Sequence, residues 1–462
     1  MERIKFIHTA DLHLGSLLHI NGEITEHMQK FVRTATMDAF RRICNAAIEH
    51  DIDFVVISGD LYDREARSVV ACRFFVEECE KLNTAGIPVF VIAGNHDPLR
   101  EQPELFKLPK NVKVFGGNKP DLYHVLGPDG QAIARVIGQS YLGRADSRKM
   151  HLDYLTPDTS IWNIGLLHTQ LDTRNLNYVP CSLSELKDKK DVHYWALGHI
   201  HKKQILLRDT PVISYPGIPQ GRDFGEEGLG GCFLVELDPL KDARLNFIVT
   251  SSVVFKRLEV WIDKDPNNIP ETITELEDLI SGIADELIEE GIKEGIKEDI
   301  EKDIDKDVDK GIDFDNESSA IDGYVVQWII KGRGKIHDTL MEQKEEASHE
   351  ITQELRRMYQ GAEPFLWTDS VDIKTRKVLP DRIEYKNNPF FQELNNVVKE
   401  CLESNAMKKQ VIQELGKIWD ERGDYENTED YRFSLNEETY EDLIQEASQL
   451  IFEKLLEEEY WI

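Results

Sequence analysis

The feature that most constrains the fold is a pattern that recurs five times in the first half of the chain. In each case an apolar run of strand length ends in polar residues that can bind a metal ion. The last of the five reads Y-W-A-L-G-H-I-H and places two histidines one residue apart. Ligand sites in open α/β sheets lie outside the carboxyl ends of the strands, so we expect the five ends to converge on one site. The polar residues at these ends are Asp11 and His13, Asp60, Asn95 with His96 and Asp97, His168, and His199 with His201.

The first hundred residues predict an alternation of strands and helices. Apolar runs typical of strands cover 4–9, 54–58 and 89–93, whereas 34–50 and 67–83 carry apolar side chains at helical spacing. This β-α-β-α-β order predicts parallel strands that are joined by helical crossovers.

Short strand patterns dominate the chain from 133 to 261. A second sheet packed on the first would account for them. The predicted fold class is therefore α/β, with two packed mixed β-sheets flanked by helices. The strands expected in this part are 133–137, 162–167, 195–197, 205–207, 212–214, 232–236, 245–249 and 253–261.

The rest of the chain predicts two further parts, because 462 residues exceed what one core usually organises. A strand at 324–331, a helix at 338–359 and a strand at 365–373 predict a small α+β capping domain. The remainder predicts a helical tail. The predicted boundaries are 1–252, 253–380 and 381–462, with tail helices at 390–403, 407–419 and 437–460.

The formal charge of −31 is concentrated in the second half of the chain. Residues 1–255 contain 33 acidic and 29 basic residues, whereas residues 256–462 contain 53 and 26. The half with the polar strand ends is therefore nearly neutral. The overall acidity does not exclude nucleic acid as a ligand of that half.

An acidic insertion at 282–317 interrupts the predicted capping domain. It contains 15 acidic and 5 basic residues, and its isoleucines recur every four residues from Ile288 to Ile304. That spacing is compatible with a charged single helix, but the glycines and aspartates lower the helix propensity. We expect disorder or a marginal helix there, rather than a packed element.

The sequence predicts a soluble cytosolic protein. No apolar run approaches the ~18 residues that a membrane span needs, and the first residues enter a strand pattern without a signal segment. The six cysteines form no C-x-x-C pair, so we expect buried reduced thiols. These are Cys44, Cys72, Cys79, Cys181, Cys232 and Cys401.

The strand-end residues offer mixed nitrogen and oxygen ligands. Asp11 and His13, two residues apart, project to the same side of an extended backbone and can bind one ion together. The whole set is too large for one ion with an open position and large enough for two ions that share a carboxylate. Imidazole ligands favour Mn²⁺, Fe or Zn²⁺ over Mg²⁺ or Ca²⁺. Two such ions promote in-line displacement at phosphorus and lower the pKa of a bound water.

As an ordered set, the motifs D-L-H, G-D-L-Y-D, G-N-H-D, L-H-T and G-H-I-H resemble those of the calcineurin-like metallophosphoesterase superfamily. The resemblance implies that Asp60 bridges two ions, most often Mn²⁺, and that His96 is catalytic. His96 would stabilise charge at the phosphorus or protonate the leaving oxygen. Asp97 is expected to orient His96 or its loop. The implied ligands are Asp11, His13 and His201 for one ion, and Asn95, His168 and His199 for the other.

The opening F-I-H-T-A-D-L-H-L-G narrows the resemblance to the SbcD-like DNA repair nucleases. Later strings, such as Y-P-G-I-P-Q-G-R, are similar to those of bacterial YhaO-type exonucleases. The resemblance covers residues 1–260 and implies DNA as substrate. It also implies a coiled-coil ATPase partner of the SbcC type, which we place on the C-terminal region, and it leaves a homodimer open. At Asp63 archaeal and eukaryotic relatives have a histidine, so no second phosphate-contacting histidine is expected here.

Basic residues near the motifs are candidates for neutralising DNA phosphates, with solvated surface as the alternative. The remaining histidines, His151 among them, are interpreted as ordinary core or surface groups. The candidate DNA-binding residues are Arg64, Arg67, Lys202, Lys203 and Arg222.

Three functions remain open at this point. The first is a metal-dependent DNA exonuclease or endonuclease in DNA repair. The second is a metallophosphatase or phosphodiesterase that acts on a small molecule or a phosphoprotein, since the motifs fit any phosphoester. The third is a scaffold without activity, which is disfavoured because every expected ligand position is filled.

Overall fold

The structure is a computed structural model that describes residues 1–64, 66–100, 105–290, 313–314, 321–378, 389–404 and 407–412, with short pieces at 440, 443–444, 447–448, 450–451 and 454. The chain divides into two compact units. One comprises Met1–Gly332 and Asp338–Thr375, and the other Arg333–His337 and Arg376–Ile462. The predicted domain boundaries at 252 and 380 stay predictions.

The first sheet has seven strands among the described residues, in the order β14-β12-β11-β1-β2-β3-β4. Strands β1 to β3 run parallel, as the alternating pattern predicts, and β4 continues this parallel order, whereas β11 runs antiparallel to β1 and β12. The strands are β1 Ile4–Thr9, β2 Phe54–Ser58, β3 Val89–Ile92, β4 Val112–Val114, β11 Gly231–Asp238, β12 Lys241–Val249 and β14 Asp313–Phe314.

The second sheet has six strands among the described residues, in the order β5-β6-β7-β8-β10-β9. Strands β6, β7, β8 and β10 are parallel, and the edge strands β5 and β9 are antiparallel. The strands are β5 Asp121–Leu126, β6 Ala132–Gly138, β7 Trp162–His168, β8 Tyr194–Gly198, β9 Gln204–Leu207 and β10 Val212–Tyr215.

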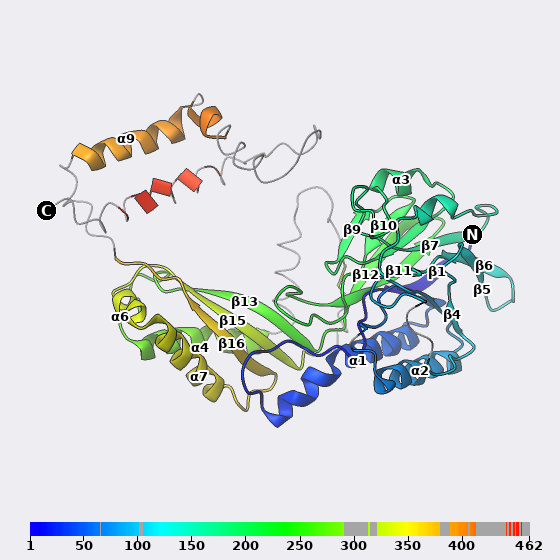
Figure 1. The fold of residues 1–462 in the computed structure, drawn as a ribbon, viewed down its shortest axis with the longest axis horizontal. Coiled ribbons are helices and arrows are strands. Elements are labelled where there is room, and N and C mark those ends of the chain that lie inside the picture. The colour runs from blue at the N-terminus through cyan, green and yellow to red at the C-terminus, as the bar shows by residue number, and fades with distance from the viewer. Residues whose placement is uncertain are drawn as a thin grey trace. The chain divides into compact units, whose positions relative to one another are not determined.

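The two sheets pack face to face, with helices on their outer faces. Phe6 of β1 stacks on Phe54 at 4.7 Å between ring centroids, and its edge meets Tyr194 of β8 at 5.1 Å. Helices α1 (Glu26–Glu49) and α2 (Val69–Thr84) lie beside each other along the first sheet (Figure 1). The predicted class, two mixed sheets flanked by helices, is confirmed.

Helix α1 begins eight residues before the predicted start at 34. Thr25 caps it, accepting a hydrogen bond from the backbone of Met28. The added turns pack on the third sheet, where the rings of Phe31 and Phe365 lie 5.2 Å apart. This tertiary contact stabilises turns whose apolar residues the sequence pattern does not reveal.

The third sheet contains the parallel strands β13 Val253–Trp261, β15 Gly323–Lys331 and β16 Phe365–Ile373. The prediction of a single helix over 338–359 is wrong. The chain instead forms α6 (Ile336–Glu342) and α7 (Lys344–Met358), because Gln343 between them has a non-helical φ of −137°.

The acidic insertion lies largely outside the described residues. Its first residues continue α4 (Ile273–Glu290), and Asp313–Phe314 form β14 on the edge of the first sheet. Of the predicted tail helices, the first is α9 (Pro389–Glu403), and the others fall mostly outside the described residues.

Among the described residues, five elements escaped prediction: β4, β5, β14, the 3₁₀ helix Met150–Asp153 and the short helix α3 (Leu183–Asp188). All six cysteines are free, and Cys401 alone is only partly buried. Within the described residues, every helix is too short or too polar to cross a membrane.

Candidate metal centre

The five polar strand ends meet at one edge of the two packed sheets. The loop after β1 runs alongside the loop after β2, because the backbone N–H of Asp11 donates to Gly59 at 3.0 Å and that of His13 donates to Asp60 at 3.1 Å. The N–H of His199 donates to the Asp11 carboxylate at 3.1 Å. These bonds tie loops that are far apart in the sequence.

Four of the predicted ligands have a backbone conformation that is rare for non-glycine residues. The φ angles are 52° at Asp11, 42° at His13, 50° at Asp60 and 99° at His199. Each such residue costs about 1–3 kcal/mol and persists only where the surrounding structure holds it in place. Strain concentrated on one set of side chains is typical of a functional site.

Two glycines permit the close approach of the ligands. A Cβ at Gly94 would lie 2.1 Å from Oδ1 of Asp60, and one at Gly59 would lie 2.3 Å from Nδ1 of His168. Any side chain at either position would displace a predicted ligand.

One half of the centre, which we call the open half, contains Asp11, His13 and His201, whose ligand atoms lie within 4.8 Å of one another. Nδ1 of His13 donates to Asp63 at 2.8 Å, and Nδ1 of His201 donates to Glu226 at 2.7 Å. In the neutral rings these bonds leave Nε2 with a lone pair.

The two Nε2 atoms of the open half face each other at 3.4 Å, and that of His201 lies 3.9 Å from Asp11. Two lone pairs and a carboxylate repel one another unless a cation lies between them. The donor set therefore fits a metal ion.

The other half, which we call the closed half, contains Asp60, His168 and His199, again within 4.8 Å, together with Asn95. Nδ1 of His168 donates to the Ser58 carbonyl at 2.9 Å, so Nε2 faces the site. That atom lies 2.9 Å from Oδ1 of Asn95 and 3.3 Å from Asp60. Nδ1 of His199 approaches the same Asn95 oxygen at 3.1 Å.

The electrostatics of the closed half show the same demand for positive charge. Burial lowers the pKa of His168, but the charge of Asp60 and its hydrogen bond raise that pKa to about 9. Burial and the neighbouring His168 lower the pKa of His199 to about 3. One positive charge is thus favoured between these groups, and either a proton or a metal ion can supply it.

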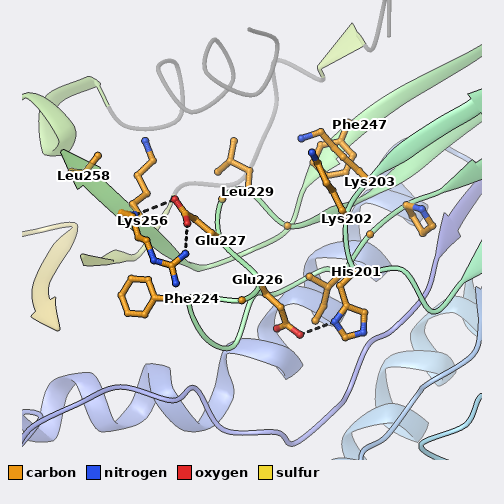
Figure 2. Close-up of a pocket in the computed structure, with 17 residues that line it drawn as sticks. His201, Lys202, Lys203, Phe224, Glu226, Glu227, Leu229, Phe247, Lys256 and Leu258 are labelled. Atoms are coloured by element: carbon orange, nitrogen blue, oxygen red, sulfur yellow. Dashed lines mark hydrogen bonds and ion pairs between the residues drawn. The ribbon is translucent and has the colours of Figure 1, made fainter. Parts of the chain in front are cut away.

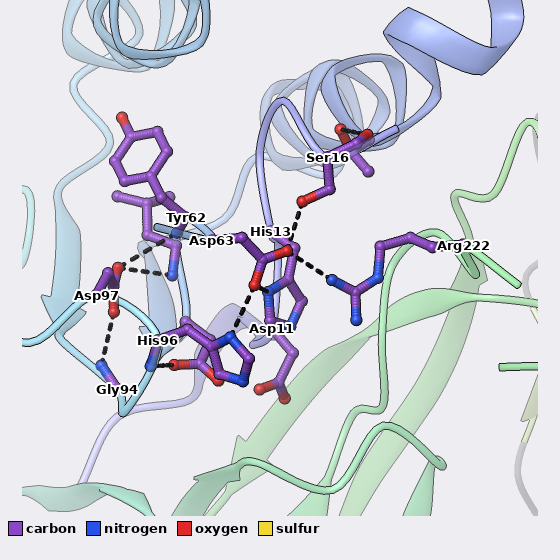
Figure 3. A network of polar contacts seen from close by, with 12 residues as sticks. Asp11, His13, Ser16, Tyr62, Asp63, Gly94, His96, Asp97 and Arg222 are labelled. Atoms are coloured by element: carbon purple, nitrogen blue, oxygen red, sulfur yellow. Dashed lines mark hydrogen bonds and ion pairs between the residues drawn. The ribbon is translucent and has the colours of Figure 1, made fainter. Parts of the chain in front are cut away.

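His96 lies beside the centre and is the most exposed of the predicted site residues there, with 47% of its side chain accessible. Its Nδ1 contacts Asp63 at 2.8 Å, and this hydrogen bond raises the pKa of His96 (Figure 3). Its backbone N–H donates to Asp60 at 2.9 Å. His96 therefore keeps a proton close to the centre without completing either half.

Asp97 points away from the centre and fixes the loops. Its carboxylate accepts hydrogen bonds from the backbone N–H groups of Leu61, Tyr62 and Gly94 (Figure 3). Burial and the charge of Asp60 raise the pKa of Asp97 to about 7. These contacts hold the loop after β2 and the loop that carries His96 together, and a role of Asp97 in orienting His96 stays a prediction.

Two acidic residues to which the sequence pattern assigned no supporting role orient the histidines of the open half. Asp63 contacts both His13 and His96, and Glu226 contacts His201. Burial alone would raise the pKa of Asp63, but the hydrogen bonds from the two histidines hold it well below its usual range. Asp63 could have been found as the last residue of G-D-L-Y-D, whereas Glu226 follows no strand end.

The candidate DNA-binding residues occupy different surroundings. Arg222 donates to Asp63 at 2.7 Å and to Glu226 at 3.0 Å, so it orients both supporting carboxylates. Arg67 lies over the ring of Tyr62 at 5.2 Å, and Arg64 is exposed.

Lys202 and Lys203 line a cavity of about 470 Å³ that reaches His201 (Figure 2). Lys256 and Arg257 add two more cations to its wall. Its two acidic residues are already paired, Glu226 with His201 and Glu227 with Arg257 at 2.9 Å. We call this cavity the basic pocket, and its charge suits an anion beside the open half.

Comparisons with known proteins agree with this geometry. A family model described as calcineurin-like phosphoesterase matches residues 4–203. The uncharacterized metallophosphoesterase YhaO of Bacillus subtilis is 34% identical over 236 residues, which are 51% of this chain and 57% of that protein.

Proteins named DNA double-strand break repair protein Mre11 also match. That of Archaeoglobus fulgidus is 26% identical over 239 residues (48% of this chain and 52% of that protein), and that of Thermoplasma acidophilum 36% over 226 (46% and 55%). The matches span about half the length of these relatives. A dimetal phosphatase structure from Danio rerio covers 54% of this chain and 96% of its own, at a TM-score of 0.35 and 13% identity, too low to carry an argument.

Proposed function

We propose that the chain is a two-metal nuclease that cleaves phosphodiester bonds in DNA, because residues 4–203 match the calcineurin-like phosphoesterase family model. The observation that carries the proposal is the pairing of an open and a closed ligand cluster beside a basic pocket. Similarity to proteins named for DNA repair supports DNA over other phosphoesters.

The residues of the two halves are the proposed ligands of the two ions. Asp11, His13 and His201 would hold one, Asn95, His168 and His199 the other, and Asp60 would bridge them. Two divalent ions, with Mn²⁺ as the leading candidate, would stabilise the attacking and leaving oxygens of an in-line displacement and activate the attacking water.

The chain's own groups supply positioning and proton transfer. His96, held through Nδ1 by Asp63, would protonate the leaving oxygen. Asp63 and Glu226 fix the rings of His13 and His201, and Arg222 fixes both carboxylates. The basic pocket would hold phosphates that flank the reacting one.

A parallel assay on 3′-labelled duplex DNA and on para-nitrophenyl phosphate, each with Mn²⁺, tests the proposal. We expect cleavage of DNA, and a Lys202→Glu/Lys203→Glu variant should lose DNA cleavage while it keeps hydrolysis of the small ester. Lys110→Glu, which makes one such charge reversal, is the control for charge far from the site, because Lys110 lies before β4 at the amino end of the parallel strands, opposite the site. Hydrolysis of the small ester alone would favour the alternative, a phosphatase or phosphodiesterase for small molecules or phosphoproteins.

We also propose that the C-terminal unit binds a coiled-coil ATPase of the SbcC type. Helix α9 supports this, since Val397 on its surface is 45% exposed. Deletion of residues 385–462 should leave metal-dependent cleavage and abolish co-purification with that ATPase. Val397→Asp in the full chain should weaken the complex, and an intact complex after deletion would exclude this unit.

A further inference from the structure

A second cluster of possible metal ligands lies away from the candidate centre, on the outer side of the second sheet. His151 comes from the 3₁₀ helix Met150–Asp153, Cys181 lies just before the cap of α3, and Glu185 is in the first turn of α3. One ligand atom of each lies within 4.8 Å of the others.

The buried side chain of His151 is the observation that indicates a metal site in this cluster. It is fully buried, and among the described residues neither ring nitrogen has a hydrogen-bond partner. The nearest carboxylate oxygen, on Glu185, lies 3.7 Å from Nε2, which is beyond hydrogen-bond range. Buried polar atoms in folded proteins are nearly always hydrogen-bonded, so an imidazole without a partner requires an explanation.

We propose that His151, Cys181 and Glu185 bind one Zn²⁺ ion, with water as the fourth ligand. Nitrogen, thiolate and carboxylate are all zinc ligands, and ligands at tetrahedral angles around zinc lie roughly 3.4–3.7 Å apart. The 3.7 Å between Nε2 of His151 and the Glu185 carboxylate falls in this range.

Binding exchanges a proton for the ion. Burial raises the pKa of the Cys181 thiol well above its usual value, so without an ion the sulfur keeps its hydrogen. On binding, the S–H bond breaks, the proton leaves to solvent, and the electron pair remains on sulfur as the ligand.

Existing contacts of the cluster limit how the ion can sit. Glu185 accepts from Lys149 at 2.6 Å through Oε1 and from the backbone of Ser182 at 2.9 Å through Oε2. Lys149 is the competing cation, but 42% of its side chain is exposed, so it can turn toward solvent. The thiol of Cys181 donates only a long bond of 3.5 Å to the Ser182 carbonyl, which metal binding would replace at little cost.

The ion would fix a loop that contacts the candidate centre. Three residues before Cys181, the ring of Tyr178 lies 4.7 Å from the ring of His199. Val179, which lies between Tyr178 and Cys181 in the sequence, has a φ of 48°. An ion bound at Cys181 would hold this strained segment in place. It would thereby keep the ring of Tyr178 against His199, a predicted ligand of the closed half.

Cobalt substitution tests the proposal without relying on activity. The candidate centre contains only nitrogen and oxygen ligands, so a thiolate-to-cobalt absorption band in Co²⁺-loaded protein must come from elsewhere. We expect the band in the full chain and also in an Asp60→Asn background, where the candidate centre is disabled.

Cys181→Ser should remove the band and one ion per chain, whereas Cys232→Ser, a matched change at another buried cysteine, should leave both. His151→Gln should weaken binding while the cysteine remains. Absence of the band in the full chain, or its survival in the Cys181→Ser variant, would overturn the zinc site. The first of these outcomes needs no variant, so misfolding of a variant cannot obscure it.

Discussion

The open and closed halves of the candidate centre are held by different kinds of partner. In the open half both imidazoles are oriented by side-chain carboxylates, Asp63 and Glu226. In the closed half, His168 is oriented by the Ser58 carbonyl at the end of β2. A backbone carbonyl in a sheet cannot be removed by substitution, whereas a carboxylate can.

This difference indicates in which half substitutions outside the ligands can change the affinity for an ion. The open half depends on side chains that also touch Arg222 and the rim of the basic pocket, so its affinity for an ion can change without loss of the fold. The closed half depends on the sheet itself. Changes outside the ligands should therefore weaken the open half first.

The largest expected effect comes from removing the group proposed to join the halves. Asp60→Asn should abolish hydrolysis, because the carboxylate charge offsets the repulsion between two cations. The fold should survive, which circular dichroism can check. Metal analysis should show that both ions are lost or weakened, and wild-type Mn²⁺-dependent cleavage by this variant would refute the two-metal mechanism.

A smaller effect is expected at His96, which belongs to neither half. His96→Ala should keep both ions and lower the rate by ~10²–10⁴-fold, the usual contribution of general acid catalysis. Metal stoichiometry and single-turnover rates measure the two parts separately. An empty half in this variant would make His96 a ligand instead of a catalyst.

A substitution at Glu226 tests most directly whether the open and closed halves bind their ions independently. Glu226→Gln keeps the shape but removes the charge that orients His201, so it should weaken one ion by ~10–100-fold and leave the other unchanged. A titration with Mn²⁺ should then show two separate binding steps. Asp223→Asn, a nearby exposed carboxylate, is the control, and equal weakening of both ions would show that the halves are not independent.

The sequence could predict which side chains meet at the candidate centre, because each follows a strand whose apolar pattern is local. Strands β13 and β16 were predicted to the residue for the same reason. The supporting carboxylate Glu226, the early start of α1 and the cluster at His151 could not be predicted, because each depends on a contact between segments that lie far apart in the chain. His151 in particular lies in an irregular segment, where no periodicity marks it.

The smallest expected effect concerns the acidic insertion, and it bears on the open half alone. Two of its described residues, Asp313 and Phe314, pair with β12 beside Phe247, and Phe247 lines the basic pocket. The insertion carries 15 acidic and 5 basic residues between 282 and 317. An acidic segment anchored at this rim would compete with DNA phosphates for the pocket, whereas a spacer without a role would not.

Replacing 291–312 with a short Gly-Ser linker decides between the two, because β14 and α4 are kept. Competition predicts a few-fold tighter DNA binding after replacement at low salt. The gain should fade as the Debye length falls from ~30 Å at 0.01 M to ~8 Å at 0.15 M. A variant with the residues of the insertion in scrambled order is the control. It keeps the charge of the insertion but not its sequence. Because para-nitrophenyl phosphate has no flanking phosphates to place in the pocket, its hydrolysis should not change. Superimposable DNA affinities at every salt concentration would identify the insertion as a spacer.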